Sequence, residues 1–412
     1  MQRNGVIDAP SKRFIFLPTI FLRFLLPSRD EQMNETTRLL RDLVALPSVN
    51  PMRADIPADI THEHRVTAYL EQFFRSLNVP FERQPVAPQR ENIVARLEMP
   101  GAKRTLMFEA HQDTVPVDGM IVPPFGAQIE GNKLFGRGSC DIKGGMAAML
   151  GAFARLVREK PKGCCNVIMA CSVDEEATML GVLELAKRTK ADFAVVAEPT
   201  NLNIVHAHKG VVRWNLFTSG RSCHSSAPEQ GVNAIYRMGK VLVGIEQYAA
   251  QLRQSVDPLL GPATISVGVI HGGVGVNTVP DRCRIEIDRR LITGENPDEQ
   301  SANLIGFLKA KAGIDFPFEL TTPYIRMPAL DPKGSEEIQK LLGAAINAER
   351  GQHKVHAVPY GTDAATLAAA GVPSIVFGPG DIAKAHTVDE WVPLDEVETA
   401  ANILYRLACS IT

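Results

Sequence analysis

Five apolar runs alternate with stretches of helical periodicity along this chain, and the alternation limits the folds that it can adopt. The runs are NIVARLEM (92–99), RTLMFEA (104–110), NVIMACSV (166–173), DFAVVAE (192–198) and PSIVFGP (373–379). Each run predicts a buried strand. Residues 61–77, 143–159 and 178–189 have apolar positions at helical spacing. We therefore expect an α/β fold with a mixed, mostly parallel sheet flanked by helices.

The segment from about 209 to 321 follows a different order. It reads as strand, helix, strand, strand, helix and strand, with helices at 231–253 and 297–312. This β-α-β-β-α-β order is that of a ferredoxin-like α+β domain. We therefore expect one domain inserted into another. The predicted bounds are 33–207 with 322–412 for the α/β domain and 208–321 for the inserted domain.

The N-terminal segment resembles a signal peptide only in part. Its apolar stretch KRFIFLPTIFLRFLLP (12–27) follows the pattern, but Arg23 and two prolines interrupt it and no small-residue cleavage site follows. Met33 opens a stretch with leucines at helical spacing. We expect residues 1–32 to be a disordered extension rather than a targeting segment.

Composition and charge exclude several classes of protein. The formal net charge is −2, which leaves no basic footprint for nucleic acid. No run of about 18 uncharged apolar residues is present, so we expect no membrane-spanning helix. The seven cysteines are an odd number without a CxxC pair. This pattern favours a reduced, cytoplasmic protein over a disulfide framework.

Titratable residues gather where the predicted strands end or a helix begins. In an open α/β sheet, ligands bind outside the carboxyl ends of the strands. The side chains expected at this edge are His111, Asp113, Asp141, Asp174, Glu175, Glu176, Glu198 and His386. Plain structural explanations exist, because Asp141 could cap the next helix and His386 could be a surface histidine. The coincidence of all of them at one edge favours a shared site.

The composition of this cluster predicts metal ions. Histidines and carboxylates without a thiolate pair suit Zn, Co or Mn. Four packed carboxylates would repel one another unless cations neutralised them. Two divalent ions about 3.5–4 Å apart, bridged by a carboxylate and a water, would do so and would activate that water. The sequence therefore predicts hydrolysis, with one unligated carboxylate as proton acceptor.

A set of motifs resembles the family of acetylornithine deacetylase, succinyl-diaminopimelate desuccinylase and carboxypeptidase G, which are co-catalytic zinc hydrolases. The resemblance runs from about residue 36 to the C-terminus. Its motifs are HQDTVP, GRGSCDIKGG, DEE, AEPT, GRSCHSSAPEQGVNAI, GGVGVNTVP and AHT. It implies a two-domain plan in which the inserted domain is a lid and dimerisation surface, and two bound zinc or cobalt ions.

The resemblance also implies metal ligands, each carried over by motif. The ligands of one metal would be His111 and Glu198, those of the other Glu176 and His386, and Asp141 would bridge the two. Asp113 would accept the second imidazole N–H of His111.

Two further roles in the reaction are implied by the same motifs. Glu175 would be the general base, and then the acid that protonates the leaving amine. His224, in the inserted domain, would reach the active site of the partner subunit in a homodimer. A surface-loop histidine is the alternative for His224.

Three further residues resemble substrate contacts. Asn277 and Arg290 lie in the inserted segment, and an arginine can clamp the carboxylate of an N-acyl amino acid. By strand alternation only one of Arg289 and Arg290 can face the site, and we favour Arg290; an exposed edge strand is the alternative. Thr362, in YGTDAATLA, would help to seat a carboxylate, unless it merely caps a helix.

We therefore predict a cytoplasmic metallohydrolase that cleaves the amide of a small N-acyl amino acid. N-acetylornithine deacetylation, a step of arginine biosynthesis, is the first expectation. Succinyl-diaminopimelate desuccinylation is the second, and a dipeptidase or carboxypeptidase the third. DEE continues as ATMLG and lacks the Arg-Phe of the related ureide hydrolases. A catalytically inactive binding protein or a structural dimer module would not need every position of the site filled.

Overall fold

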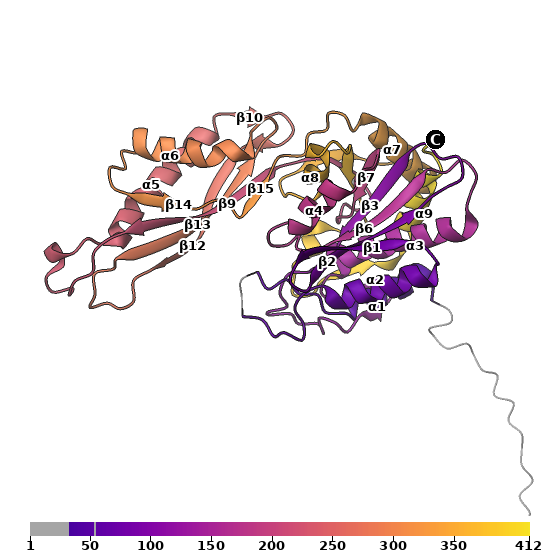
Figure 1. Ribbon diagram of the computed structural model, residues 1–412, viewed down its shortest axis with the longest axis horizontal. Coiled ribbons are helices and arrows are strands. Elements are labelled where there is room, and N and C mark those ends of the chain that lie inside the picture. Colours follow the sequence, from indigo (N-terminus) through magenta and orange to yellow (C-terminus); the bar gives the residue numbers. More distant parts are fainter. Residues whose placement is uncertain (1–32, 53–54) are drawn as a thin grey trace, which may run out of the picture. The chain divides into compact units, whose positions relative to one another are not determined.

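The computed structural model describes residues 33–412 except 53 and 54, and Figure 1 shows their elements. The prediction for residues 1–32 lies outside the described residues. Residues Glu35–Thr412 form one compact unit. Across the part of the chain that the structure describes, every helix is too short or too polar to cross a bilayer.

The described residues contain a large sheet of eight strands in the order β1-β2-β6-β3-β7-β17-β8-β16. Four neighbouring pairs are parallel, β6–β3, β3–β7, β7–β17 and β8–β16, and the other three are antiparallel. The mixed, mostly parallel sheet is therefore confirmed. The strands are β1 (Phe81–Ala87), β2 (Arg90–Leu97), β3 (Thr105–His111), β6 (Asn166–Ser172), β7 (Phe193–Val196), β8 (Ile204–His208), β16 (Val355–Val358) and β17 (Ser374–Val376).

Helices cover both faces of this sheet, which explains why its inner strands read as continuous apolar runs. Along β3, Leu106 and Phe108 belong to one apolar cluster, and Met107 between them belongs to another. The first cluster includes α1 (Glu35–Val44), α2 (His64–Ser76), α3 (Gly144–Glu159), α7 (Glu336–Arg350) and α9 (Leu394–Ala408). The second includes α4 (Leu180–Arg188) and α8 (Ala364–Ala369).

The inserted segment forms a second, antiparallel sheet with the order β12-β13-β9-β14, and β15 also pairs with β9. Its own apolar core contains Trp214, Ile285 and Leu304. The ferredoxin-like order is confirmed, while the domain bounds at 208 and 321 stay a prediction. The elements are β9 (Gly210–Ser219), α5 (Ala234–Leu252), β12 (Thr264–Gly272), β13 (Arg282–Leu291), α6 (Gln300–Ala310), β14 (Phe318–Leu320) and β15 (Ile325–Met327).

Smaller elements complete the described chain. A three-stranded sheet, in the order β18-β5-β4, lies beside the start of α3. Its strands are β4 (Gln128–Glu130), β5 (Lys133–Phe135) and β18 (Trp391–Pro393). The short pair is β10 (Val256–Asp257) and β11 (Gly261–Pro262). A π-helical turn, η1 (Ser139–Lys143), directly precedes α3, and short 3₁₀ turns lie at Pro228–Gln230, Pro297–Glu299 and Ile382–Lys384.

Candidate metal centre

Three parallel strands of the large sheet deliver titratable side chains to one edge. His111 is the last residue of β3, Asp174 lies two residues beyond β6, and Glu198 lies two residues beyond β7. Because β3 pairs in parallel with both β6 and β7, these carboxyl ends share an edge. The structure therefore brings the predicted cluster together at the edge that the sequence indicated.

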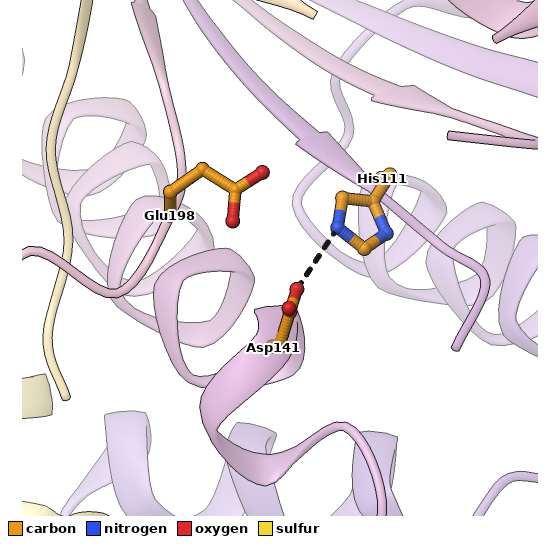
Figure 2. Close-up of side chains that lie close together, drawn as sticks. All are labelled: His111, Asp141 and Glu198. Atoms are coloured by element: carbon orange, nitrogen blue, oxygen red, sulfur yellow. Dashed lines mark ion pairs between the residues drawn. The ribbon is translucent and has the colours of Figure 1, made fainter. Parts of the chain in front are cut away.

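One group of this cluster consists of His111, Asp141 and Glu198, all buried (Figure 2). Their potential ligand atoms all lie within 4.8 Å of one another. The Nε2 atom of His111 is 3.2 Å from Oδ1 of Asp141. This nitrogen is buried, yet it makes no hydrogen bond to any described residue. A buried nitrogen without a hydrogen bond, aimed between carboxylates, is what a metal ligand requires.

A second group shares Asp141 with the first. It consists of Asp141, Glu176 and His386, whose potential ligand atoms also lie within 4.8 Å of one another. The Nε2 atom of His386 is 3.2 Å from Oδ2 of Asp141 and 3.2 Å from Oε1 of Glu176. The two oxygens of Asp141 thus face different histidines, which is the arrangement of a bridging carboxylate.

The electrostatics of the cluster favour bound cations. Burial, together with the charges of Asp141 and Glu175, raises the pKa of Glu198 well above its usual value. Burial also opposes ionisation of Asp141, but the neighbouring imidazoles of His111 and His386 outweigh it and lower its pKa. Hydrogen bonds to Asp141 and Glu176 raise the pKa of His386 to about 10. The carboxylates therefore stay ionised only where positive charge is close to them.

Asp113 contacts its surroundings differently from what the resemblance implies. The Nδ1 atom of His111 lies 3.0 Å from the backbone carbonyl oxygen of Asp113, and 3.7 Å from its carboxylate. A proton on Nδ1 would donate to this carbonyl and leave Nε2 as the metal-binding atom. The carboxylate of Asp113 instead accepts the backbone N–H groups of Glu175 and Glu176, at 3.1 and 3.2 Å. It therefore fixes the loop that carries the expected base.

Of the two neighbouring arginines, Arg290 is the one that lies beside the cluster. It lines a cavity of about 140 Å³ together with Glu175, Glu176 and Tyr360. Its guanidinium pairs with Asp288 at 2.7 Å. Arg289 points the other way and is buried against Glu295. Because β13 lies between β12 and β9, the alternative of an exposed edge strand is wrong.

The structure favours the capping alternative for Thr362. Its side chain is fully buried, and its Oγ1 lies 3.1 Å from Nε2 of His208. The same oxygen accepts the backbone N–H of Ala364, the first residue of α8, at 3.2 Å. The hydroxyl is therefore engaged inside the fold, and the expectation that it seats a substrate carboxylate has no support from its position.

His224 and Asn277 lie together on two loops of the inserted domain. The hydrogen bonds described below join these loops to each other and not to the metal cluster. His224 is exposed, and its Nδ1 is 2.7 Å from the hydroxyl of Ser226. The backbone of His224 bridges to Thr278, and Ser225 donates to the carbonyl of Asn277. Their hydrogen bonds thus hold two loops of the insert to each other.

A buried polar network next to the site was not predicted from the sequence. Asn50 donates to Asp113 at 2.8 Å and to Asp174 at 3.0 Å. Arg90 pairs with Asp174 at 2.6 Å and with the fully buried Glu63. Asp174 therefore belongs to this supporting network. Asn50 stands in the motif-free stretch PSVNPM, and no sequence signal connects it to residues 63 and 124 positions away.

Comparison with known proteins gives related sequences over most of the chain. The family model of peptidase family M20/M25/M40 matches residues 107–410. An acetylornithine deacetylase of Myxococcus xanthus is 31% identical over 326 residues, 77% of this chain and 83% of the relative. An acetylornithine deacetylase of Photorhabdus laumondii is 30% identical over 388 residues, 90% of this chain and 95% of the relative.

Solved structures resemble the fold at lower identity. An M20 family metallo-carboxypeptidase from Sulfolobus solfataricus has a TM-score of 0.74 at 19% identity, over 92% of this chain and 99% of its own. A dinuclear metal-binding peptidase of the M20 family from Bacillus subtilis has a TM-score of 0.65 at 16% identity, over 91% and 97%. Both likenesses concern the fold alone.

Proposed function

The chain belongs to peptidase family M20/M25/M40 and is a metal-dependent hydrolase, and from this premise we propose that it removes the acyl group of an N-acyl amino acid. N-acetylornithine is the first candidate substrate, because the related sequences of Myxococcus xanthus and Photorhabdus laumondii carry the name acetylornithine deacetylase. The observation that best supports hydrolysis is the position of Asp141, whose two carboxylate oxygens face one histidine each.

The residues present fit two divalent cations, zinc or cobalt. His111 and Glu198 would hold one ion, Glu176 and His386 the other, and Asp141 would bridge them. Three observations support this assignment: the two ligand groups, the unpartnered Nε2 of His111, and the shared carboxylate. When bound, such a pair polarises the scissile carbonyl and acidifies a water.

Glu175 would move the proton. It stands beside Glu176, is half-buried and lines the cavity that Arg290 also lines. Burial raises the pKa of its carboxyl, which suits a group that takes a proton near neutral pH. One carboxylate oxygen of Glu175 would accept a proton from the attacking water and return it to the leaving nitrogen. The hydrogen bonds from the loop to Asp113 would hold this carboxylate in place.

Arg290 would orient the substrate through its carboxylate. Its guanidinium is charged and already pairs with one carboxylate, that of Asp288. A substrate carboxylate in the cavity would compete for the same donors, and a bidentate pair would fix the position of the amide. Asn277, which lies in the loop next to His224, would supply a polar contact once that loop meets a substrate.

A homodimer would form through the inserted sheet. β12 is an edge strand of that sheet, and Val269 and Ile270 on it are exposed. Val274 and Val276, in the loop that follows, are almost fully exposed as well. Exposed apolar edges are sites where chains pair. A two-fold dimer through β12 would carry the loop of His224 to a second subunit.

A cytoplasmic location would suit the cysteines. All seven are free thiols within the described residues. Unpaired cysteines are typical of a reducing compartment.

A peptidase activity is the second candidate function, because the solved structure from Sulfolobus solfataricus is a metallo-carboxypeptidase. A substrate panel separates the two. N-acetylornithine, N-succinyl-diaminopimelate and dipeptides would be assayed with added zinc or cobalt, before and after removal of metal by chelation. We expect N-acetylornithine to be hydrolysed best, and chelation to abolish turnover reversibly. Hydrolysis of dipeptides alone would overturn the deacetylase assignment, and full turnover of the metal-free protein would overturn the metal assignment.

A further inference from the structure

The loop that carries Asp141 donates its backbone N–H groups to a residue far along the chain. Residues Gly138 to Asp141 precede α3, and Gly138 has φ of 81°, in the left-handed region. Gly138, the residue before this helical start, has no side chain that could cap it, and the side chain of Lys143 makes no cap hydrogen bond. Backbone N–H groups at a helix start need acceptors. Here the acceptor is the carboxylate of Glu390.

Glu390 satisfies this loop with both of its oxygens. Oε1 accepts the backbone N–H groups of Cys140 and Asp141, at 3.0 and 3.1 Å. Oε2 accepts the backbone N–H of Gly138 at 3.1 Å and Nη1 of Arg137 at 2.5 Å. Glu390 is fully buried. An ionised carboxylate is stable in such a place only when it is paired and hydrogen-bonded, and four donors provide this.

The same contacts tie three ligand-bearing segments together. Arg137 donates through Nε to the carbonyl of Pro116, in the segment that begins with His111. Gly136 donates its backbone N–H to the carbonyl of Glu390, four residues after His386. The loop of Asp141 is thus fixed to the segments of both histidines through one buried ion pair.

In this arrangement one acid, Glu390, accepts the N–H groups of the loop, and another, Asp141, faces the two histidines. Asp141 could have capped the helix with its own carboxylate, as many aspartates do. Because Glu390 accepts the loop N–H groups from 249 residues away, Asp141 keeps both of its oxygens for His111 and His386. The backbone N–H of Asp141 is itself one of the groups held.

We propose that Glu390 is the positioning residue of the metal centre: paired with Arg137, it holds the loop so that Asp141 can bridge two cations. This inference rests on the proposed metal centre and adds a residue outside the ligand set. Groups that orient metal ligands typically change metal affinity by about 10–100-fold when they are replaced.

The test replaces Glu390 without changing its volume. In Glu390→Gln the amide can accept with one atom only, and its NH₂ group meets the N–H donors of the loop. We expect the affinity for cobalt, measured by competition with a chromogenic chelator, to fall about 10–100-fold. The visible absorption of the cobalt-loaded protein should change too, since the bridging carboxylate shifts. Arg137→Lys, which keeps the charge but loses the second donor to Pro116, should give a smaller loss of the same kind.

Glu295→Gln is the matched control. Glu295 pairs with the buried Arg289 and accepts the backbone N–H of Ile292, so it repeats the chemistry of Glu390 in the other sheet. We expect its melting temperature to fall while its cobalt affinity and spectrum stay those of the wild type. Equal cobalt affinity in Glu390→Gln and the wild type would overturn the role of Glu390 alone, as would equal losses in both variants. A wild-type protein that binds no cobalt would overturn the metal centre itself.

Discussion

The two sheets of this molecule differ in the exposure of their candidate functional residues. The large sheet buries His111, Asp141 and Glu198 at the carboxyl ends of its strands, with their potential ligand atoms within 4.8 Å of one another. The inserted sheet leaves its proposed functional residue His224 exposed, on a loop beside an apolar edge strand. The first region is a site assembled inside one chain. The second is an exposed surface, and we expect its residues to take part in the reaction only when a second subunit packs against it.

The largest effect is expected in the large sheet, at two neighbouring acids with different roles. Glu175→Ala should keep both metals and lose turnover by roughly 10²–10⁴-fold, because the proton shuttle is lost. Glu176→Ala should lose occupancy of one metal, because Glu176 lies 3.2 Å from His386 in the second ligand group. Elemental analysis and steady-state kinetics distinguish the two variants. Equal metal loss in both would mean that their roles are assigned wrongly.

The inserted sheet should show a smaller, intersubunit effect at His224. A donor at the open face of the developing oxyanion is worth about 10²–10³-fold, so His224→Ala should be nearly inactive. When His224→Ala and Glu175→Ala subunits are mixed and re-associated, half of the dimers are mixed. Each mixed dimer then has one site with its own Glu175 and its partner's His224. Recovery of up to about a quarter of wild-type turnover is expected from this symmetry.

The control for this experiment uses two defects of the same site. Mixed dimers of Glu175→Ala and Glu176→Ala carry a damaged active site in each subunit, because one lacks the proton shuttle and the other a metal ligand, so mixing should restore nothing. Subunit exchange is verified by native mass spectrometry in both experiments. Verified exchange without recovery in the His224 mixture would leave His224 as an ordinary surface histidine.

The same contrast explains how much could be predicted from the sequence. The cluster of titratable residues was predicted because parallel strands end at one edge of the sheet, where residues far apart in the chain converge. Its individual ligands were assigned by the resemblance of their motifs. The supporting residues were not found. Glu390 acts on backbone N–H groups 249 and 250 residues away, and backbone groups leave no sequence signal. A hydroxyl that precedes a helix, such as that of Thr362, can contact either a ligand or the helix itself. Here the contact with His208 shows that the hydroxyl faces into the fold, and the sequence does not reveal this contact.

Edge strands offer a third test of the contrast, with a partial effect on turnover. Ile270→Lys places a charge on the exposed edge strand β12, where we expect two chains to pair. Val355→Lys places the same charge on β16, one of the two edge strands of the large sheet. Sedimentation should show that the first substitution shifts the protein toward monomer and that the second does not. A dimer that is unaffected by Ile270→Lys would place the interface elsewhere.

The smallest effect on turnover is expected at His208, where the two sheets join, because this residue affects the free energy of unfolding. This residue ends β8 of the large sheet, and β9 of the inserted sheet begins at Gly210. Burial lowers the pKa of His208 from 6.5 to about 4, so the folded chain keeps this imidazole neutral. The unfolded chain binds a proton in the range between these two values, while the folded chain does not. Stability is therefore complete above about pH 6.5 and falls as the pH decreases toward 4, by roughly 3 kcal/mol.

Replacing the imidazole should remove this part of the acid sensitivity. His208→Gln cannot gain a proton on unfolding, so its free energy of unfolding should decrease less between about pH 7 and pH 4.5 than that of the wild type. His206→Gln is the matched control, because it removes a half-buried histidine from the same strand that contacts Gln339. Urea titrations at both pH values measure the difference between the two variants. If both variants depend on pH in the same way, burial of His208 does not make the junction of the sheets sensitive to acid.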